Sequence, residues 1–225
     1  MQDQTADVNW RAGDVPVSSR FDDPYFSLED GLAETRHVFL NGNDLPQRFR
    51  DGFHIAELGF GTGLNFLAAV DAWQSAGIPG RLQFTSFEAF PMSSTDIERA
   101  LSAFSGAGLP AQELLDNWSP AGGRMSPLPY VSLDVVVGDA RDTLGRWPGA
   151  ADAWFLDGFS PAKNPELWGE DILRDVAAHT VPGGTCATYT AAGFVRRNLK
   201  AAGFDVMRTP GFGRKRHMTR GTFLP

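Results

Sequence analysis

One segment, residues 53–65, constrains the fold of this 225-residue chain more than any other. Its first half is a run of mostly apolar residues that predicts a buried strand. The apolar stretch from Leu64 to Trp73 predicts a helix, and between the two lie glycines at alternate positions, Gly59, Gly61 and Gly63. A strand, a glycine-rich turn and a helix in this order form the opening unit of a nucleotide-binding α/β fold.

The spacing of these glycines bears on which ligand the turn would hold. A dinucleotide-binding turn has the pattern G-x-G-x-x-G, whereas this chain has G-x-G-x-G, with Glu57 two residues before the first glycine. A carboxylate there suits the positive end of an amino acid ligand and opposes a pyrophosphate. The pattern E-x-G-x-G-x-G resembles the first motif of class I methyltransferases, which bind S-adenosylmethionine. A tight strand-to-helix connection in another α/β protein is the alternative.

Acidic residues also stand at the ends of two later predicted strands, where ligands gather in an open α/β sheet. Glu88 ends the strand 82–88 and would accept both hydroxyl hydrogens of a ribose; an exposed strand-end carboxylate is the alternative. Asp139 follows the strand 131–137 and would hold an adenine amino group, while the backbone N–H of Ala140 meets a ring nitrogen. Capping of the short helix that follows is a second role, and Asp139 can fill both.

A fourth acid, Asp157, ends the strand that begins at Ala153. A stiff loop containing Phe159 and two prolines follows it. We expect Asp157 to face the place where a methyl donor and its acceptor meet. Its alternative role, compatible with the first, is to accept hydrogen bonds from backbone N–H groups of the turn after it.

The resemblance to class I methyltransferases implies a Rossmann-like α/β fold with a mostly parallel seven-stranded sheet and an antiparallel C-terminal strand. We expect one domain, residues 1–225, with a core at 53–225 and an N-terminal extension at 1–52 that covers the pocket. Within the extension we expect short strands at 15–18 and 25–27 and a helix from Leu28. That helix would be capped by Ser27. We expect the segment 120–129 to be a loop, and a hairpin of strands at 204–207 and 218–223 to close the fold.

The amino-acid composition and the N-terminal sequence indicate where the protein is located and which partners it can bind. No 18-residue apolar run is present, and the N-terminus does not have the pattern of a signal peptide, so we expect a cytoplasmic protein without a membrane span. The single cysteine, Cys186, lies in an apolar run and is expected in the core. The net charge of −7 argues mildly against a nucleic-acid partner, but cations gather near the end of the chain at Arg214, Lys215 and Arg216. A solvated hairpin tip is the alternative for that cluster.

Two segments carry a more specific resemblance. The stretch from Gly31 to Asn43 and the stretch from Asp152 to Pro165 resemble the methyltransferase half of the bifunctional tRNA 5-methylaminomethyl-2-thiouridine biosynthesis family. The similarity runs from about Trp10 to Phe223. It implies transfer of a methyl group from S-adenosylmethionine to the primary amine of 5-aminomethyl-uridine, often 2-thiolated, at the wobble position of tRNA.

The resemblance also implies site residues. The cofactor-binding set is Glu57, Gly59, Gly61, Gly63, Asn65, Glu88, Asp139, Ala140 and Asp157. Bifunctional family members carry a flavin-dependent domain that makes the amine. Because this chain ends at Pro225, we expect it to lack the flavin domain and its FAD, and to be a stand-alone enzyme or a fragment of a longer chain. We also expect no metal. We expect a monomer that receives its amine from a separate enzyme.

At the reaction centre the resemblance assigns three residues. An alkylamine has a pKa of about 10, for which an unperturbed carboxylate is a poor base, so Asp157 is expected chiefly to position the amine. Phe159 would stack on a flipped base, and Tyr25 would close the pocket. Lys163 would contact a phosphate or be an ordinary exposed lysine, and Arg214, Lys215 and Arg216 would contact the tRNA.

Two other functions remain open from the sequence. The first is a class I methyltransferase that acts on a small-molecule or protein amine, which the acidic composition favours. The second is a Rossmann-type protein that binds a nucleotide and serves as a structural partner. Acids at four successive strand ends argue against the second.

Overall fold

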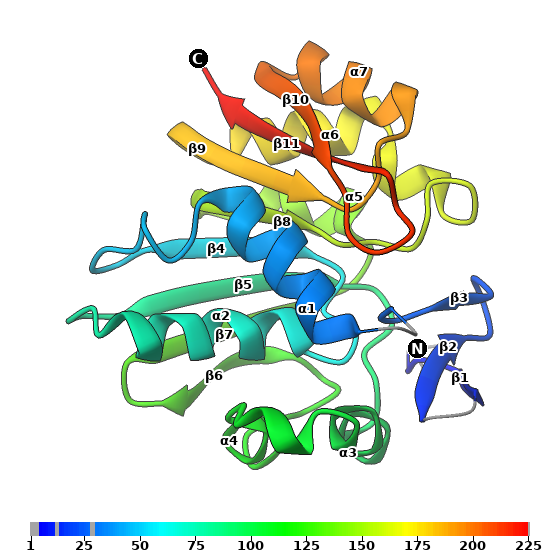
Figure 1. Cartoon of the computed structure of the whole chain (residues 1–225), viewed down its shortest axis with the longest axis vertical. Coiled ribbons are helices and arrows are strands. Elements are labelled where there is room, and N and C mark those ends of the chain that lie inside the picture. The colour runs from blue at the N-terminus through cyan, green and yellow to red at the C-terminus, as the bar shows by residue number, and fades with distance from the viewer. Residues whose placement is uncertain (1–4, 12–13, 28–29, 225) are drawn as a thin grey trace.

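The computed structural model describes residues 5–11, 14–27 and 30–224, and an eight-stranded sheet forms its centre (Figure 1). The strand order is β10-β11-β9-β8-β4-β5-β7-β6. The strands are β4 (His54–Leu58), β5 (Leu82–Glu88), β6 (Gly123–Leu128), β7 (Val131–Val137), β8 (Ala151–Leu156), β9 (Thr180–Thr188), β10 (Phe204–Pro210) and β11 (His217–Phe223).

The middle of this sheet is parallel, and both of its margins contain antiparallel pairs. Strands β7, β5, β4, β8 and β9 run parallel, which reproduces the first five positions of a doubly wound nucleotide-binding sheet. Strand β11 is antiparallel to both β9 and β10. The predicted α/β sheet, mostly parallel with an antiparallel C-terminal strand, is therefore confirmed.

The predicted number of seven strands was one too few. The segment 120–129 was predicted as a loop because it is rich in proline and glycine, but part of it forms β6, antiparallel to β7. Strand β6 lies at the edge of the sheet, where the missing N–H of Pro127 needs no partner strand. A register shift between Met125 and Leu128 absorbs the irregularity.

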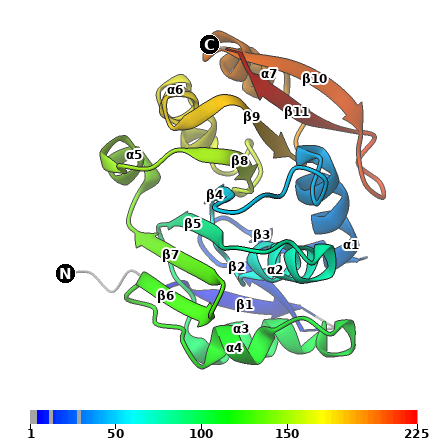
Figure 2. The same cartoon turned by 90° about the vertical axis from the view of Figure 1, so that its left-hand side faces the viewer.

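Helices cover both faces of the sheet, as Figure 2 shows. They are α1 (Gly31–Thr35), α2 (Leu64–Ala76), α3 (Ser94–Ser102), α4 (Ala111–Leu115), α5 (Ala140–Thr143), α6 (Glu170–Ala178) and α7 (Gly193–Ala201). Short π or 3-10 turns lie at η1 (Arg36–Leu40), η2 (Asn41–Asn43), η3 (Ser105–Ala107), η4 (Leu144–Arg146) and η5 (Pro165–Trp168). Strand β8 sends Phe155 into the core beneath α2 and Trp154 into the core beneath α6 and α7. Because both faces are covered, β8 is apolar almost throughout, as a central parallel strand requires.

The N-terminal extension begins with a separate three-stranded antiparallel sheet of β1 (Val8–Arg11), β2 (Val15–Ser18) and β3 (Asp23–Pro24). The strand predicted at 25–27 was wrong, because the pairing with β2 involves residues 23 and 24 instead. The predicted cap Ser27 is also replaced. Asp30 caps α1, its Oδ1 accepting from the backbone N–H of Ala33 at 2.9 Å. The predicted first helical residue, Leu28, lies outside the described residues.

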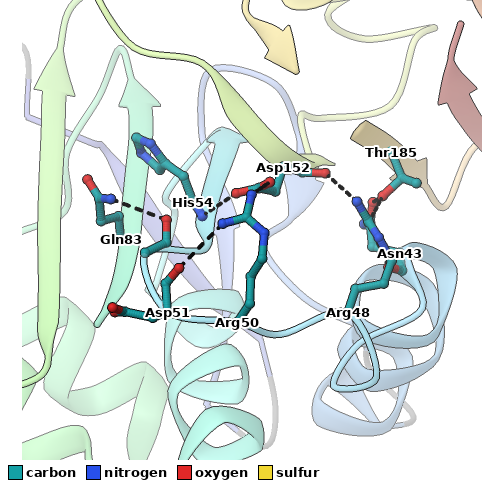
Figure 3. Close-up of polar contacts among 9 residues, drawn as sticks. Asn43, Arg48, Arg50, Asp51, His54, Gln83, Asp152 and Thr185 are labelled. Carbon is teal, nitrogen blue, oxygen red and sulfur yellow. Dashed lines mark hydrogen bonds and ion pairs between the residues drawn. The ribbon is translucent and has the colours of Figure 1, made fainter. Parts of the chain in front are cut away.

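The last part of the extension is fastened to the edge of the sheet where the parallel strands begin (Figure 3). Arg48 donates to the backbone oxygen of Asp152 at 3.0 Å and to Thr185 Oγ1 at 2.5 Å. Arg50 Nη2 lies 2.6 Å from Asp152 Oδ1, and the backbone N–H of His54 donates to Asp152 Oδ2 at 2.8 Å. This network fixes where the chain enters β4, and therefore where the glycine turn after β4 lies.

Candidate active site

A cavity of about 490 Å³ opens at the other edge of the sheet, beyond the carboxyl ends of β4, β5 and β8. Its walls come from the glycine turn, from the segments that follow β5, β7 and β8, and from the extension between Arg20 and Phe39. The cavity therefore lies where nucleotide ligands bind in open α/β sheets.

Two of the three glycines need their lack of a side chain for the shape of this cavity. Gly59 has a φ of 89°, and a Cβ there would lie 2.6 Å from the backbone oxygen of Asp157. Gly61 has a φ of 55°, and a Cβ there would lie 3.2 Å from the ring of Tyr25. Gly63 is the N-cap of α2 and faces Leu114 rather than the cavity.

Asn65, in the first turn of α2, joins two of the predicted acids. Its Nδ2 donates to Glu57 Oε1 at 2.9 Å and to Asp157 Oδ2 at 2.6 Å, and its Oδ1 accepts from Thr35 Oγ1 at 2.9 Å. Both amide hydrogens and the amide oxygen are thus engaged, so the orientation of Asn65 is fixed. Glu57 also accepts from Ser86 Oγ at 2.7 Å and is fully buried, so it holds Asn65 and does not line the cavity.

Asp157 is the acid whose surroundings matter most for chemistry. Burial raises its pKa from 3.8 to about 7, opposed by the hydrogen bond from Asn65 and the positive charge of Lys215. Burial likewise raises the pKa of Glu57 well above its usual value. The premise that Asp157 is an unperturbed carboxylate was therefore wrong, because the carboxyl lies in a poorly solvated site without a cation in direct contact.

An ion pair faces the same cavity. Lys215 Nζ lies 2.7 Å from Glu34 Oε1 and 4.2 Å from the centre of the Tyr189 ring. Tyr189 in turn donates to the backbone oxygen of Gly158 at 2.8 Å. Lys215, predicted as a tRNA contact on an exposed loop, thus extends from the β10–β11 loop into the wall of the cavity.

Glu88 lies at the carboxyl end of β5, beside the glycine turn. Its Oε2 accepts from the backbone N–H of Gly61 at 3.0 Å, and its Oε1 accepts from the backbone N–H of Phe90 at 2.7 Å. Burial raises the pKa of Glu88, against the lowering effect of these backbone hydrogen bonds. Each carboxylate oxygen keeps a further lone pair that can accept from a ligand hydroxyl.

Asp139 and Ala140 line the cavity at the start of α5. Asp139 caps this helix through the backbone N–H of Arg141 at 2.9 Å, and its carboxylate also pairs with the Arg141 side chain, at 2.6 Å from Nη2. The hydrogen bonds from the Arg141 side chain lower the pKa of Asp139. The cap was predicted from the sequence, whereas no sequence pattern predicted the contact with Arg141, which lines the cavity too.

An aromatic group forms part of the cavity wall. Phe159 stacks on Phe21 with ring centres 4.7 Å apart and meets the edge of Tyr25 at 5.1 Å. Arg20 lies over the ring of Phe90 at 4.8 Å. The structure thus brings Tyr25 and Phe159 together as expected, and it adds Phe21, Phe90 and Arg20, which carried no motif that could have revealed them.

The other predicted tRNA contacts lie outside the cavity. Lys163 binds the backbone oxygen of Asp22 and lies 3.3 Å from its carboxylate, so it ties the loop after β8 to the extension. Asp23 strengthens this tie by accepting from the backbone N–H of Ser160 at 2.8 Å. Arg214 and Arg216 are exposed on the β10–β11 loop.

In residues 5–11, 14–27 and 30–224, no cluster of three or more histidine, cysteine or acidic side chains is arranged to hold a metal ion. In the same ranges, none of the helices has the length and apolar character needed to cross a membrane. Cys186 is buried in the core, as predicted.

Together the sheet, the glycine turn and the strand-end acids define a Rossmann-like α/β protein with a pocket for a nucleotide-type ligand. Comparison with known proteins specifies the class. The model of an S-adenosyl-L-methionine-dependent methyltransferase family matches residues 110–223. The chain therefore belongs to the S-adenosyl-L-methionine-dependent methyltransferase family.

Individual relatives agree with this assignment and with the resemblance noted in the sequence. The bifunctional protein MnmC of tRNA 5-methylaminomethyl-2-thiouridine biosynthesis from Caulobacter sp. (strain K31) is 48% identical over 229 residues, which cover 96% of this chain and 38% of the relative. MnmC from Caulobacter vibrioides is 49% identical over 214 residues, which cover 92% of this chain and 36% of the relative. The chain spans little more than a third of the length of these relatives.

A solved structure shows the same fold. The crystal structure of MNMC2 from Aquifex aeolicus has a TM-score of 0.74 and 25% sequence identity to this chain. The match covers 100% of this chain and 73% of the Aquifex chain. The expected class I methyltransferase fold is thus supported independently of the sequence motifs.

Proposed function

We propose that this chain transfers a methyl group from S-adenosylmethionine to the amine of 5-aminomethyl-(2-thio)uridine at the tRNA wobble position, giving 5-methylaminomethyl-(2-thio)uridine. The observation that carries the proposal is Asp157, a half-buried carboxylate facing the cavity and bonded to an amide rather than to a cation. The tRNA modification in the names of the MnmC relatives supports the choice of substrate.

The residues of the cavity fit the cofactor. Glu88 would accept from ribose hydroxyls, Asp139 and Ala140 would hold an adenine edge, and Gly59 and Gly61 leave room for close approach. Glu57 contributes indirectly, because it fixes the Asn65 amide that holds Asp157. When bound, S-adenosylmethionine would supply an electrophilic methyl group on a positively charged sulfur.

Asp157 then has two tasks. Its carboxylate accepts a hydrogen bond from the substrate nitrogen and orients that nitrogen. It would also take up a proton from the substrate ammonium, which frees the nitrogen lone pair to bond the methyl carbon as the methyl–sulfur bond breaks and the sulfur leaves as a neutral thioether. A pKa of about 7 makes this carboxylate a better proton acceptor than an ordinary aspartate. Positioning and proton transfer are therefore assigned to one side chain.

The aromatic group provides a place for the base. We infer that Phe159 stacks on the flipped uridine and that Tyr25 and Phe21 close the pocket from the extension. In this scheme residues 1–52 cover the core 53–225, and the two act as one methyltransferase domain. We further infer a cytoplasmic, monomeric enzyme that receives its aminomethyl substrate from a separate enzyme.

The test is transfer of labelled methyl groups to tRNA that carries 5-aminomethyl-uridine, with the wild type, Asp157→Asn and the exposed control Asp142→Asn. We expect label on the wobble uridine with the wild type and the control, and a loss of at least a hundredfold with Asp157→Asn. Label that is undiminished in Asp157→Asn would refute its role. Label on free amines or proteins, but not on tRNA, would instead support the alternative of a small-molecule or protein amine.

A further inference from the structure

Charge is divided unevenly along this chain. Residues 176–225 hold eight Lys and Arg and a single acid, Asp205, for a net charge of +7. Residues 1–175 hold twelve Lys and Arg and twenty-six acids, for a net charge of −14. The overall charge of −7 therefore conceals a strongly positive C-terminal part, and the acidic average carries no argument against a polyanionic partner.

The fold gathers this positive part at one end of the sheet, where α7 packs beside β10 and β11 (Figure 1). Helix α7 buries Val195 and Leu199 against the core. Because a helix advances 100° per residue, Arg197 and Lys200 face solvent on the opposite side, and the half-buried Arg196 lies at the margin of that side. The cations of α7 thus form a single surface.

Strand β10 and the loop after it extend this surface toward the cavity. Arg208 is exposed near the end of β10, and Arg216 is exposed on the loop. Partial desolvation, together with the positive charges of Arg208, Arg216 and Arg196, lowers the pKa of His217. The charges of all three arginines therefore act on His217. We call Arg196, Arg197, Lys200, Arg208 and Arg216 the cationic face.

The cationic face is not neutralised by the protein. In the part of the chain that the structure describes, none of its five members forms an ion pair with an acid. Elsewhere such pairs are common, as between Arg36 and Asp71 at 3.0 Å or between Arg99 and Asp14 at 2.9 Å. Unpaired cations clustered on one surface are the pattern expected of a phosphate-binding face.

The cationic face also leads to the cavity. Strand β10 is antiparallel to β11, which is antiparallel to β9, so β10 ends at the same edge of the sheet as the parallel strands. The loop that follows β10 carries Arg216 outward and Lys215 inward to Glu34 and the cavity wall. A polyanion on the cationic face therefore lies beside the opening that a flipped nucleotide would use.

We propose that the cationic face is a docking surface for the phosphate backbone of the tRNA, extending well beyond the β10–β11 loop to α7. The inference rests on the proposed function for its partner. RNA stems are recognised largely through their backbone and shape, which suits a surface of arginines and a lysine. The surface anchors the stem while the wobble nucleotide enters the cavity.

The test compares two triple variants that each remove three positive charges. Arg197→Gln/Lys200→Gln/Arg208→Gln lies on the cationic face, and Arg81→Gln/Arg124→Gln/Arg146→Gln, exposed on other parts of the molecule, is the matched control. Binding of unmodified tRNA is measured by fluorescence anisotropy from low to high salt, alongside methyl transfer. Circular dichroism and melting temperature verify that both variants fold.

We expect the cationic-face variant to bind tRNA about tenfold more weakly or worse at low salt. The plot of log K against log salt should become less steep, its negative slope decreasing in magnitude by about two. The value of kcat at saturating tRNA should stay within about twofold of the wild type. The control should bind like the wild type. Equal losses in both variants, or no loss in either, would overturn the docking surface while leaving the proposed function standing.

Two further outcomes separate the hypotheses. If the wild type binds tRNA through the cationic face but transfers no methyl group to 5-aminomethyl-uridine tRNA, the docking surface stands and the proposed reaction fails. If the cationic-face variant keeps its tRNA affinity but loses binding to phosphatidylserine vesicles, the surface serves a membrane, and the proposal is wrong.

Discussion

The two ends of strand β8 carry aspartates in contrasting surroundings. Asp152, near the start, accepts from the guanidinium of Arg50 and from the backbone N–H of His54. Asp157, just after the end, accepts only from the Asn65 amide among the described residues, while the nearby Lys215 is paired with Glu34. The fold supplies a cation to the first carboxylate and withholds one from the second. A protonated substrate amine would supply the positive charge that Asp157 lacks.

The largest expected effect comes from removing the charge at the second site. Asp157→Asn should lower kcat by at least a hundredfold, because the variant can neither attract nor deprotonate the amine. Its free energy of unfolding at pH 8 should equal or exceed that of the wild type. The reason is that burial disfavours the ionised carboxylate, whose pKa in the folded protein is about 7 rather than 3.8. Steady-state kinetics measure the loss of kcat, and urea unfolding measures the free energy of unfolding. A clear loss of stability in Asp157→Asn would contradict the view that burial disfavours the ionised carboxylate.

The opposite outcome is expected at the first site. Asp152→Ala should destabilise the protein by about 2 kcal/mol, because Arg50 and the N–H of His54 both lose their acceptor. Binding of S-adenosylmethionine by the folded fraction should be unchanged. Asp171→Asn, which removes a fully exposed pair with Arg174, is the control and should change stability by less than about 0.5 kcal/mol. Equal effects from the two variants would show that the network in Figure 3 does not fasten the extension.

The pH dependence of activity tests whether Asp157 must be ionised for catalysis. The ionised form of Asp157 is the active one, so kcat/KM should rise with pH and level off above about 7. The charged groups nearest Asp157 are Lys215 and Glu34, and Glu57, whose pKa burial raises, also lies close to it. The Asn65 amide and Tyr189 complete its surroundings.

Lys215→Met should shift this acid limb to higher pH, because it removes a charge that favours the carboxylate. Glu34→Gln should shift it to lower pH, because Lys215 is then unpaired and the repelling charge is gone. Each shift should be about half a unit to one unit. Two shifts in the same direction would refute the electrostatic link.

The smallest expected effect concerns the side chain that fixes Asn65. Thr35→Val removes the hydrogen bond to Asn65 Oδ1 and should lower kcat about threefold, with a matching small loss of stability. Thr180→Val, which removes a buried hydroxyl bonded to the backbone oxygen of Val176 at the opposite edge of the sheet, should cost stability but no activity. Steady-state kinetics at saturating substrates compare the two.

Much of this site was predictable because parallel strands end at a common edge. An acid at the end of each apolar run sufficed to place Glu88, Asp139 and Asp157 near one another and near the glycine turn. The motif could not show which way Glu57 points. It turns toward Asn65 beneath the cavity instead of lining it, a difference that depends on packing against α2.

Other contacts join segments that no local pattern connects. Glu34 and Lys215 are far apart in the sequence, and only the placement of the extension against the β10–β11 loop brings them together. Strand β6 was missed for a different reason. Proline and glycine are typical of turns, but an edge strand tolerates both because one side of its backbone needs no partner.

The separation of +7 and −14 along the chain has a kinetic consequence. A molecule with opposite charges at its two ends behaves as a dipole in the field of a polyanion. It would turn before contact, so that α7 and the cavity opening approach first while the acidic remainder is repelled. Productive encounters would then form a larger share of all collisions in dilute salt, and the advantage would fade as the ionic atmosphere contracts below the size of the protein.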